Sequence, residues 1–144
     1  MHKKEKIPLI KVVFGTKGVG KTKYLIEDAH RTVDTCNGHV VFIDTGNELI
    51  TALRHEVRLV NIQEFNIDNL CSFYGFVSGL IAADYDIAAL YTDRLDLISG
   101  KNPDYQEFFE KIKELHDRFN IRFVFSVSGN IKDIPDFITK EYAL

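Results

Sequence analysis

The chain has 144 residues, of which 45% are hydrophobic and 27% are charged, and its formal net charge is -3. This length and composition are typical of a single globular domain, residues 1–144, and they exclude a disordered or low-complexity protein. The negative net charge disfavours nucleic acid as a partner, because Lys and Arg side chains that neutralise phosphates supply most of that affinity.

The chain begins with a short basic cluster in residues 1–6, which is interrupted by Glu5. We expect a disordered, solvated end there. The apolar run that follows, residues 7–14, is short and broken by Lys11, so it does not predict a signal peptide. We therefore expect a cytoplasmic protein with no membrane insertion.

A glycine-rich loop follows directly. Residues 8–14 are apolar and β-branched, which is typical of a buried strand, and residues 21–33 carry the apolar face of a helix. Between them the sequence matches the Walker A pattern G-x-x-x-x-G-K-[ST] at every fixed position. A strand before the pattern and a helix after it are the context that the pattern requires.

The loop contains each kind of group that is needed to bind a nucleoside triphosphate. Its glycines allow main-chain N–H groups to approach phosphate oxygens, and the following helix adds its positive end. Lys21 would reach the β- and γ-phosphates, and the Thr22 hydroxyl would be a ligand of Mg2+. The predicted cofactor-binding residues are Gly15, Thr16, Lys17, Gly18, Val19, Gly20, Lys21, Thr22 and Lys23.

Two further strands are predicted next. Residues 39–44 are apolar on both faces, as expected inside a parallel sheet, and they end at Asp44. Residues 58–62 predict a short edge strand. A largely apolar helix is then expected over residues 67–83, with Gly75 and Gly79 on one face, where they would let the helix lie close to the sheet. Its length is below the roughly 20 residues needed to cross a bilayer.

The second half continues the alternation. Residues 87–93 predict a buried strand closed by Asp93. Asn102 and Pro103 are expected to open a clearly amphipathic helix, whose apolar positions run from Tyr105 to Phe119. Residues 121–127 predict the last strand, and we expect a short helix in the tail, residues 133–144. Strands that alternate with helices predict an α/β fold: a three-layer sandwich with a mostly parallel sheet of about five strands and helices on both faces.

Two carboxylates compete for the Mg2+ site. The predicted residue is Asp93, and Asp44 is the alternative, since both end apolar strands whose carboxyl ends meet at the ligand-binding edge of such a sheet. Either would also be a catalytic candidate together with Lys21. The residue after Asp93 is Arg94 rather than a glutamate that could polarise water, so hydrolysis is not established by the pattern. Arg94 is open to two interpretations, a finger acting across an interface or a surface salt bridge.

The end of the last predicted strand offers Ser128 or Asn130 as a reader of the γ-phosphate, with an ordinary turn as the alternative. A guanine-reading N-K-x-D pattern is missing, so ATP is favoured over GTP.

Together these motifs resemble the P-loop NTPase superfamily, in its RecA-like branch. The loop, residues 74–79, residues 85–87 and the strand to Asp93 also look like a group of short bacterial P-loop proteins, some of which carry a twitching-motility ATPase label. The resemblance covers nearly the whole chain and implies a nucleotide-binding fold. The histidine-containing motifs of retraction motors are missing from this sequence.

We therefore expect an ATP-binding protein, acting as a small ATPase or an ATP-dependent switch with ATP and Mg2+ as cofactors. Its partner would be a protein or a second copy of the chain. Two alternatives remain open. The first is a phosphotransferase acting on a small metabolite, and the second is an adaptor that binds nucleotide without hydrolysing it.

Overall fold

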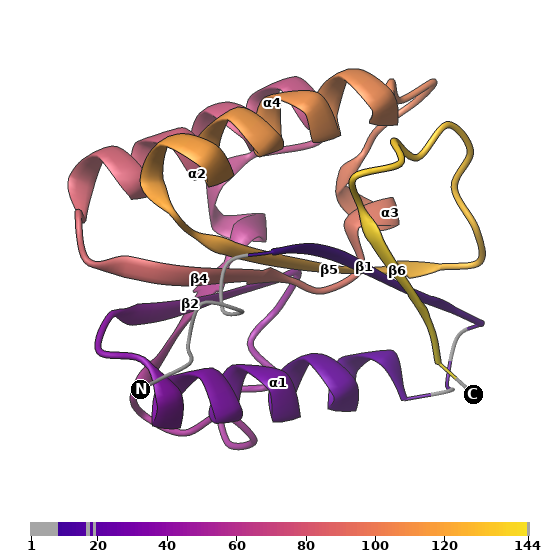
Figure 1. Ribbon diagram of the computed structural model, residues 1–144. Helices are drawn as coiled ribbons and strands as arrows, with labels where there is room; N and C mark the ends of the chain where they lie inside the picture. Colours follow the sequence, from indigo (N-terminus) through magenta and orange to yellow (C-terminus); the bar gives the residue numbers. More distant parts are fainter. Residues whose placement is uncertain (1–8, 17, 19, 144) are drawn as a thin grey trace.

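The structure, a computed structural model, describes residues 9–16, 18 and 20–143. It contains one six-stranded sheet with the order β3-β2-β4-β5-β1-β6, in which all paired strands are parallel (Figure 1). The strands are β1 (Ile10–Gly15), β2 (His39–Asp44), β3 (Val57–Asn61), β4 (Ile87–Thr92), β5 (Arg122–Ser128) and β6 (Thr139–Tyr142). The predicted α/β class, parallel sheet and edge strand β3 are confirmed.

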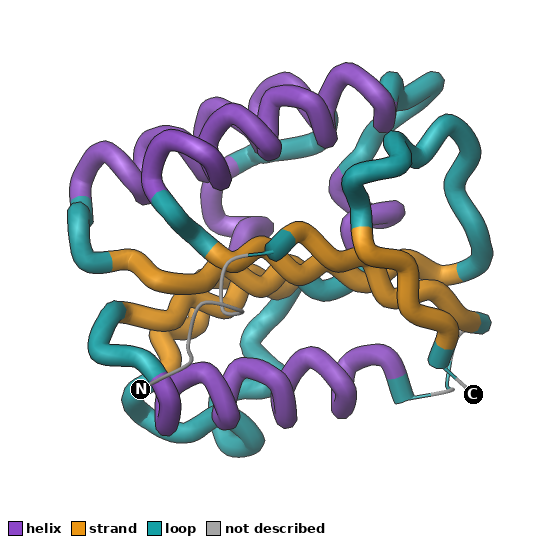
Figure 2. Tube along the Cα trace, viewed as in Figure 1, coloured by secondary structure: helices purple, strands orange, loops and turns teal. Residues whose placement is uncertain are grey.

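Helices cover both faces of this sheet. They are α1 (Lys21–Thr35), the 3-10 helix η2 (Ile62–Phe65), α2 (Leu70–Ala83), the short α3 (Leu95–Ile98) and α4 (Tyr105–Phe119). Helix α1 lies alone on one face, whereas α2, α3 and α4 lie on the other (Figures 1 and 2). The layers follow from strands that are apolar on both sides: Val12 and Phe14 pack toward α2 and α4, and Val13 between them packs toward α1.

The expected tail helix is wrong. The segment forms β6, which pairs in parallel with the outer edge of β1, Lys11 opposite Thr139. Its residues are exposed and carry no helical apolar face, so main-chain hydrogen bonds to the free strand edge decide its structure. The sheet therefore has six strands rather than about five.

The expected role of the α2 glycines is also wrong. Gly75 and Gly79 are exposed, and a Cβ added at either would meet nothing within 4 Å. Helix α2 packs on the sheet through the opposite side, which carries Leu70, Phe73 and Val77. Along the described ranges, no helix is both long enough and apolar enough to cross a membrane.

A buried polar network fastens α1 to the sheet. Asp28 of α1 accepts hydrogen bonds from the Arg122 guanidinium, with the closest N–O distance 2.9 Å, and from the Tyr91 hydroxyl at 2.7 Å. Tyr91 also shares a 2.8 Å hydrogen bond with Thr32. Burial opposes the charged form of Asp28, but the hydrogen bond from Tyr91 and the charge of Arg122 outweigh it, so the pKa of Asp28 is lowered.

Candidate functional site

The loop between β1 and α1 lies at the carboxyl edge of the sheet. Gly18 and Gly20 have φ values of 89° and 97°, a left-handed conformation that residues with a Cβ rarely adopt. A Cβ at either position would meet nothing within 4 Å, so backbone conformation, not space, requires glycine there. Lys17 and Val19, which the sequence placed among the cofactor contacts, lie outside the described residues.

Lys21 is the first residue of α1, and its side chain folds back over the loop. It is 5% exposed, and its ammonium donates to the carbonyl oxygens of Gly15 at 2.9 Å and of Thr16 at 2.8 Å. Burial lowers the pKa of Lys21, with the nearby Arg94 charge acting in the same direction. Lys23, also predicted to contact the cofactor, is exposed to solvent.

Thr22 joins the loop to the end of β4. Its hydroxyl donates to the Asp93 carboxylate at 2.8 Å, across 71 residues of sequence. Asp93 is 3% exposed, and its second oxygen accepts from the Ser126 hydroxyl at 2.6 Å. Its main-chain N–H donates to the carbonyl of Ile43 in β2 at 3.0 Å. The structure thus brings together the two residues that the sequence named as metal ligands.

Asp44 ends the neighbouring strand and has a different environment. It is 6% exposed, and one of its oxygens accepts from the main-chain N–H of Thr45 at 2.8 Å. Burial raises the pKa of Asp44, and the negative charges of Asp93 and Glu48 raise it further. A carboxyl group with increased proton affinity has the chemistry of a general base.

A cavity of about 320 Å³ opens over the loop. Its lining residues come from the loop, from the start of α1 and from the ends of β4 and β5: Gly18, Gly20, Lys21, Thr22, Arg94 and Ser128. The Arg94 Nε and the Ser128 hydroxyl are buried and have no hydrogen-bond partner within the part of the chain that the structure describes. Asn130, the alternative to Ser128, lines a different cavity.

Sequence reasoning missed one residue of this site and left another unassigned. Ser126 was missed. Its hydroxyl contacts Asp93 and also accepts the main-chain N–H of Arg94 at 2.7 Å. The unassigned residue is Asp96, whose carboxylate accepts the main-chain N–H of Ser128 at 3.0 Å. The signal for Ser126 was a lone hydroxyl inside the apolar run of β5, where a buried polar group needs a partner.

The donor set fits a triphosphate with Mg2+. A hydroxyl and a carboxylate are hard oxygen ligands of the kind that Mg2+ prefers. Two cations, Lys21 and Arg94, face the same cavity, and two buried polar groups in its wall have no partner in the described part of the chain. Such groups are costly to bury unless a ligand completes their hydrogen bonds.

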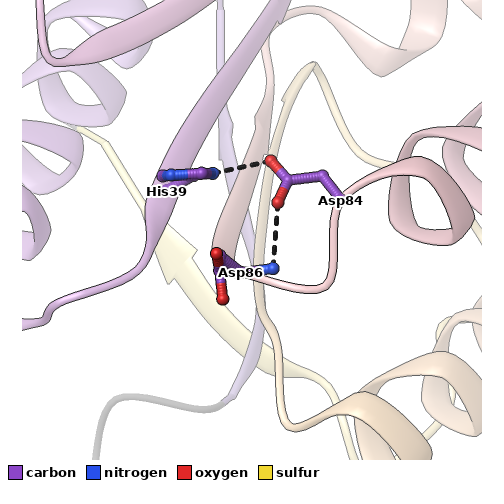
Figure 3. A group of neighbouring side chains, drawn as sticks. All are labelled: His39, Asp84 and Asp86. Atoms are coloured by element: carbon purple, nitrogen blue, oxygen red, sulfur yellow. Dashed lines mark hydrogen bonds and ion pairs between the residues drawn. The ribbon is translucent and has the colours of Figure 1, made fainter.

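A second polar cluster lies at the opposite, amino-terminal edge of the sheet (Figure 3). His39 Nδ1 is 2.7 Å from an oxygen of Asp84, whose other oxygen accepts the main-chain N–H of Asp86 at 2.9 Å. A Cβ on Gly38 would lie 2.5 Å from the Asp86 carbonyl oxygen, so glycine allows this approach. These bonds fasten the turn before β4 to the start of β2, and they account for the cluster.

We expect the pKa of His39, followed by NMR, to lie above its ordinary value of 6.5, because the Asp84 hydrogen bond favours the imidazolium. The Asp84→Asn variant should bring it back toward that value. The small stabilisation from this pair is present below the unfolded pKa and is lost as the pH rises through the folded pKa. An unchanged His39 titration in the variant would contradict this assignment.

No protein-family model matches this chain, and no curated protein matches it. Solved structures do. ATPases 2 and 3 of Thermomonospora curvata EccC, in complex with a signal sequence peptide, match with a TM-score of 0.61 and 12% identity over 89% of this chain and 26% of that one.

Two further solved structures have a similar fold. The flagellar accessory protein FlaH from Methanocaldococcus jannaschii matches with a TM-score of 0.57 and 11% identity, over 90% of this chain and 64% of that one. The cytoplasmic domain of the Thermomonospora curvata type VII secretion ATPase EccC gives 0.56 and 11%, over 89% of this chain and 17% of that one. This chain thus spans about a quarter or less of the EccC chains. At these identities the likeness shows the fold alone, an α/β fold that this chain shares with the ATPase domains of EccC.

Proposed function

We propose that this chain binds ATP with Mg2+ in the cavity over residues 15–22 and acts as a small ATPase or an ATP-dependent switch. The observation that carries the proposal is the 2.8 Å hydrogen bond to Asp93 from Thr22, which lines the cavity together with Lys21. A match to a short motif and a fold shared with ATPase domains support it independently.

Each residue of the site has a role under this proposal. Lys21 leaves the carbonyls of Gly15 and Thr16 and donates to the β- and γ-phosphates. Thr22 and Asp93 hold Mg2+, which neutralises phosphate charge when bound. Ser126 keeps one oxygen of Asp93 engaged, so the carboxylate keeps its orientation whether or not a ligand is bound.

Asp44 is the residue that we assign to activating water. It ends β2 next to β4, close enough to Asp93 for the two charges to interact, and its raised pKa favours proton uptake. The water oxygen would bond to the γ-phosphorus while its proton passes to Asp44. The bond from that phosphorus to the bridging oxygen would break, leaving ADP and inorganic phosphate.

The solved neighbours suggest how such an activity would be used. One is a type VII secretion ATPase and another is a flagellar accessory protein, and both roles belong to those proteins. For this chain we propose only the shared element, a nucleotide site whose state a protein partner or a second copy would read. We propose a cytoplasmic location on the same basis.

Purified protein incubated with ATP labelled on the γ-phosphate separates the possible functions. Release of labelled inorganic phosphate that depends on Mg2+ supports the ATPase, and transfer of the label to a metabolite in a cell extract would indicate a phosphotransferase. Retention of intact bound ATP would indicate the adaptor. Absence of any ATP binding would contradict the proposal.

Substitution of Asp93 and substitution of Asp44 should change different measured quantities, the first ATP binding and the second phosphate release. We expect Asp93→Asn to weaken Mg2+-dependent ATP binding by about 10–100-fold, the usual range for residues that support a metal. Asp44→Asn should keep that binding and lower phosphate release by about 100–10,000-fold, as for loss of a general base. Titration calorimetry with and without Mg2+ and a phosphate-release assay check both. The reverse pattern would assign the metal to Asp44.

A further inference from the structure

Arg94 has an unusual place in the chain. It follows Asp93 directly and has φ 61° and ψ 57°, a left-handed conformation that is costly for a residue with a Cβ. The Ser126 hydroxyl accepts its main-chain N–H at 2.7 Å, and α3 begins at the next residue. Because Ser126 also holds Asp93, the backbone of Arg94 is fastened to the candidate metal ligand.

This backbone geometry places the Arg94 side chain over the loop of its own chain. The side chain lines the same cavity as Gly18, Lys21 and Thr22, from the side of β4 and β5. Its Nε is buried and unpartnered within the described residues. A surface salt bridge, one of the two interpretations that the sequence left open, therefore does not describe this arginine.

The chemistry of the cavity wall selects an anion as the missing partner. Three carboxylates near Arg94 already have partners: Asp93 accepts from Thr22 and Ser126, Asp96 accepts from the main-chain N–H of Ser128, and Asp44 accepts from the main-chain N–H of Thr45. The Ser128 hydroxyl, which lines the cavity beside Arg94, also has no hydrogen-bond partner among the residues that the structure describes. A guanidinium group can donate two parallel hydrogen bonds to the oxygens of one phosphate, and a neighbouring hydroxyl can donate a third.

From these contacts we infer that Arg94, together with Ser128, binds the terminal phosphate of the nucleotide held by its own chain, so that this residue distinguishes ATP from ADP. The inference rests on the proposed nucleotide site. In the proposed complex, the loop side of the cavity, with Gly18 and Gly20, would cradle the inner phosphates, and the wall that carries Arg94 and Ser128 would face the terminal phosphate. An arginine from a second subunit is then not needed to complete the phosphate contacts.

The test compares affinities for a non-hydrolysable ATP analogue and for ADP, both with Mg2+, by titration calorimetry. In Arg94→Ala, affinity for the triphosphate analogue should fall by about 10–100-fold, the range for lost hydrogen bonds to a charged group, whereas affinity for ADP should change less than about threefold. Arg94→Lys should recover part of the lost affinity for the triphosphate analogue, because lysine keeps the positive charge but lacks the paired N–H donors of the guanidinium. Arg118→Ala, an exposed arginine on α4, is the control and should match the wild type.

Several outcomes would overturn the inference. Equal loss of affinity for both nucleotides in Arg94→Ala and Arg94→Lys, with thermal unfolding unchanged, would show that Arg94 does not read the terminal phosphate. If Arg94→Ala does not fold, Arg94→Lys must show the selective loss by itself, and unchanged selectivity there would contradict the inference. A wild-type protein that binds neither nucleotide would overturn the proposed function and this inference with it.

Mixing two variants tests whether Arg94 acts within its own chain. Lys21→Ala supplies a normal Arg94 but a defective loop, and Arg94→Ala supplies the reverse. Since Arg94 contacts the nucleotide of its own chain, the mixture should bind the triphosphate analogue no more tightly than Arg94→Ala does. Recovery of wild-type affinity in the mixture would show that the arginine acts across an interface.

Discussion

Lys21→Ala should reduce ATP affinity by at least about 100-fold, since two or more hydrogen bonds from a cation to phosphate oxygens are lost together. The fold should persist. The Lys21 ammonium donates to the loop carbonyls of Gly15 and Thr16, at the ligand edge of the sheet rather than between its layers. Titration calorimetry gives the affinity, and thermal unfolding monitors the fold.

Lys113→Ala is the matched control for that experiment. Lys113 is a half-exposed lysine of α4 whose ammonium lies 2.7 Å from Asp117, one turn further along the same helix. Its removal should leave ATP affinity at the wild-type value. If Lys21→Ala bound ATP as tightly as this control does, the phosphate loop would not be the nucleotide site, and the proposed function would fail.

Asp28→Ala should destabilise the protein by about 3–5 kcal/mol, because it leaves the buried Arg122 charge without its carboxylate. Arg122 is only 8% exposed, and Tyr91 would lose a hydrogen-bond acceptor at the same time. Chemical denaturation measures the free energy of unfolding. The control, Asp34→Ala, removes an exposed carboxylate of the same helix that pairs with Arg54, and it should cost less than about 1 kcal/mol.

This network also predicts a pH dependence. Because the folded protein lowers the pKa of Asp28 below its ordinary value of 3.8, its contribution to stability is complete above that value. The contribution is lost as the pH falls through the folded pKa. Stability of the wild type should therefore fall more steeply in acid than that of Asp28→Asn. Equal acid dependence of the two proteins would show that Asp28 is not held in its charged form by Tyr91 and Arg122.

Local patterns predicted most of the elements correctly because those elements carry local signals. The apolar faces of α1 and α4 and the apolar runs of β1, β2, β4 and β5 are visible within a window of a few residues. Segments without such a pattern were harder. Strand β6 has only exposed side chains, and main-chain pairing with the free edge of β1 determines its structure.

The glycines of α2 show a second limit of local patterns. Small residues four positions apart indicate a helix face without bulky side chains, but this pattern does not predict which part of the protein contacts that face. The opposite face carries Phe73 and Val77, whose burial contributes far more free energy than a glycine contact, so Gly75 and Gly79 turn to solvent.

By itself, the sequence determined the phosphate loop, the order of strands and helices, and hence the edge of the sheet where a ligand would lie. These features depend on residues adjacent in the chain. Only the tertiary structure decided that the Thr22 hydroxyl meets Asp93 rather than Asp44, that Ser126 holds Asp93, and that Arg94 turns into the cavity. The hydrogen bonds join residues 32 to 71 positions apart, which the order of strands in the sheet brings together. The place of the Arg94 side chain depends on one strained backbone conformation, which no local sequence pattern indicates.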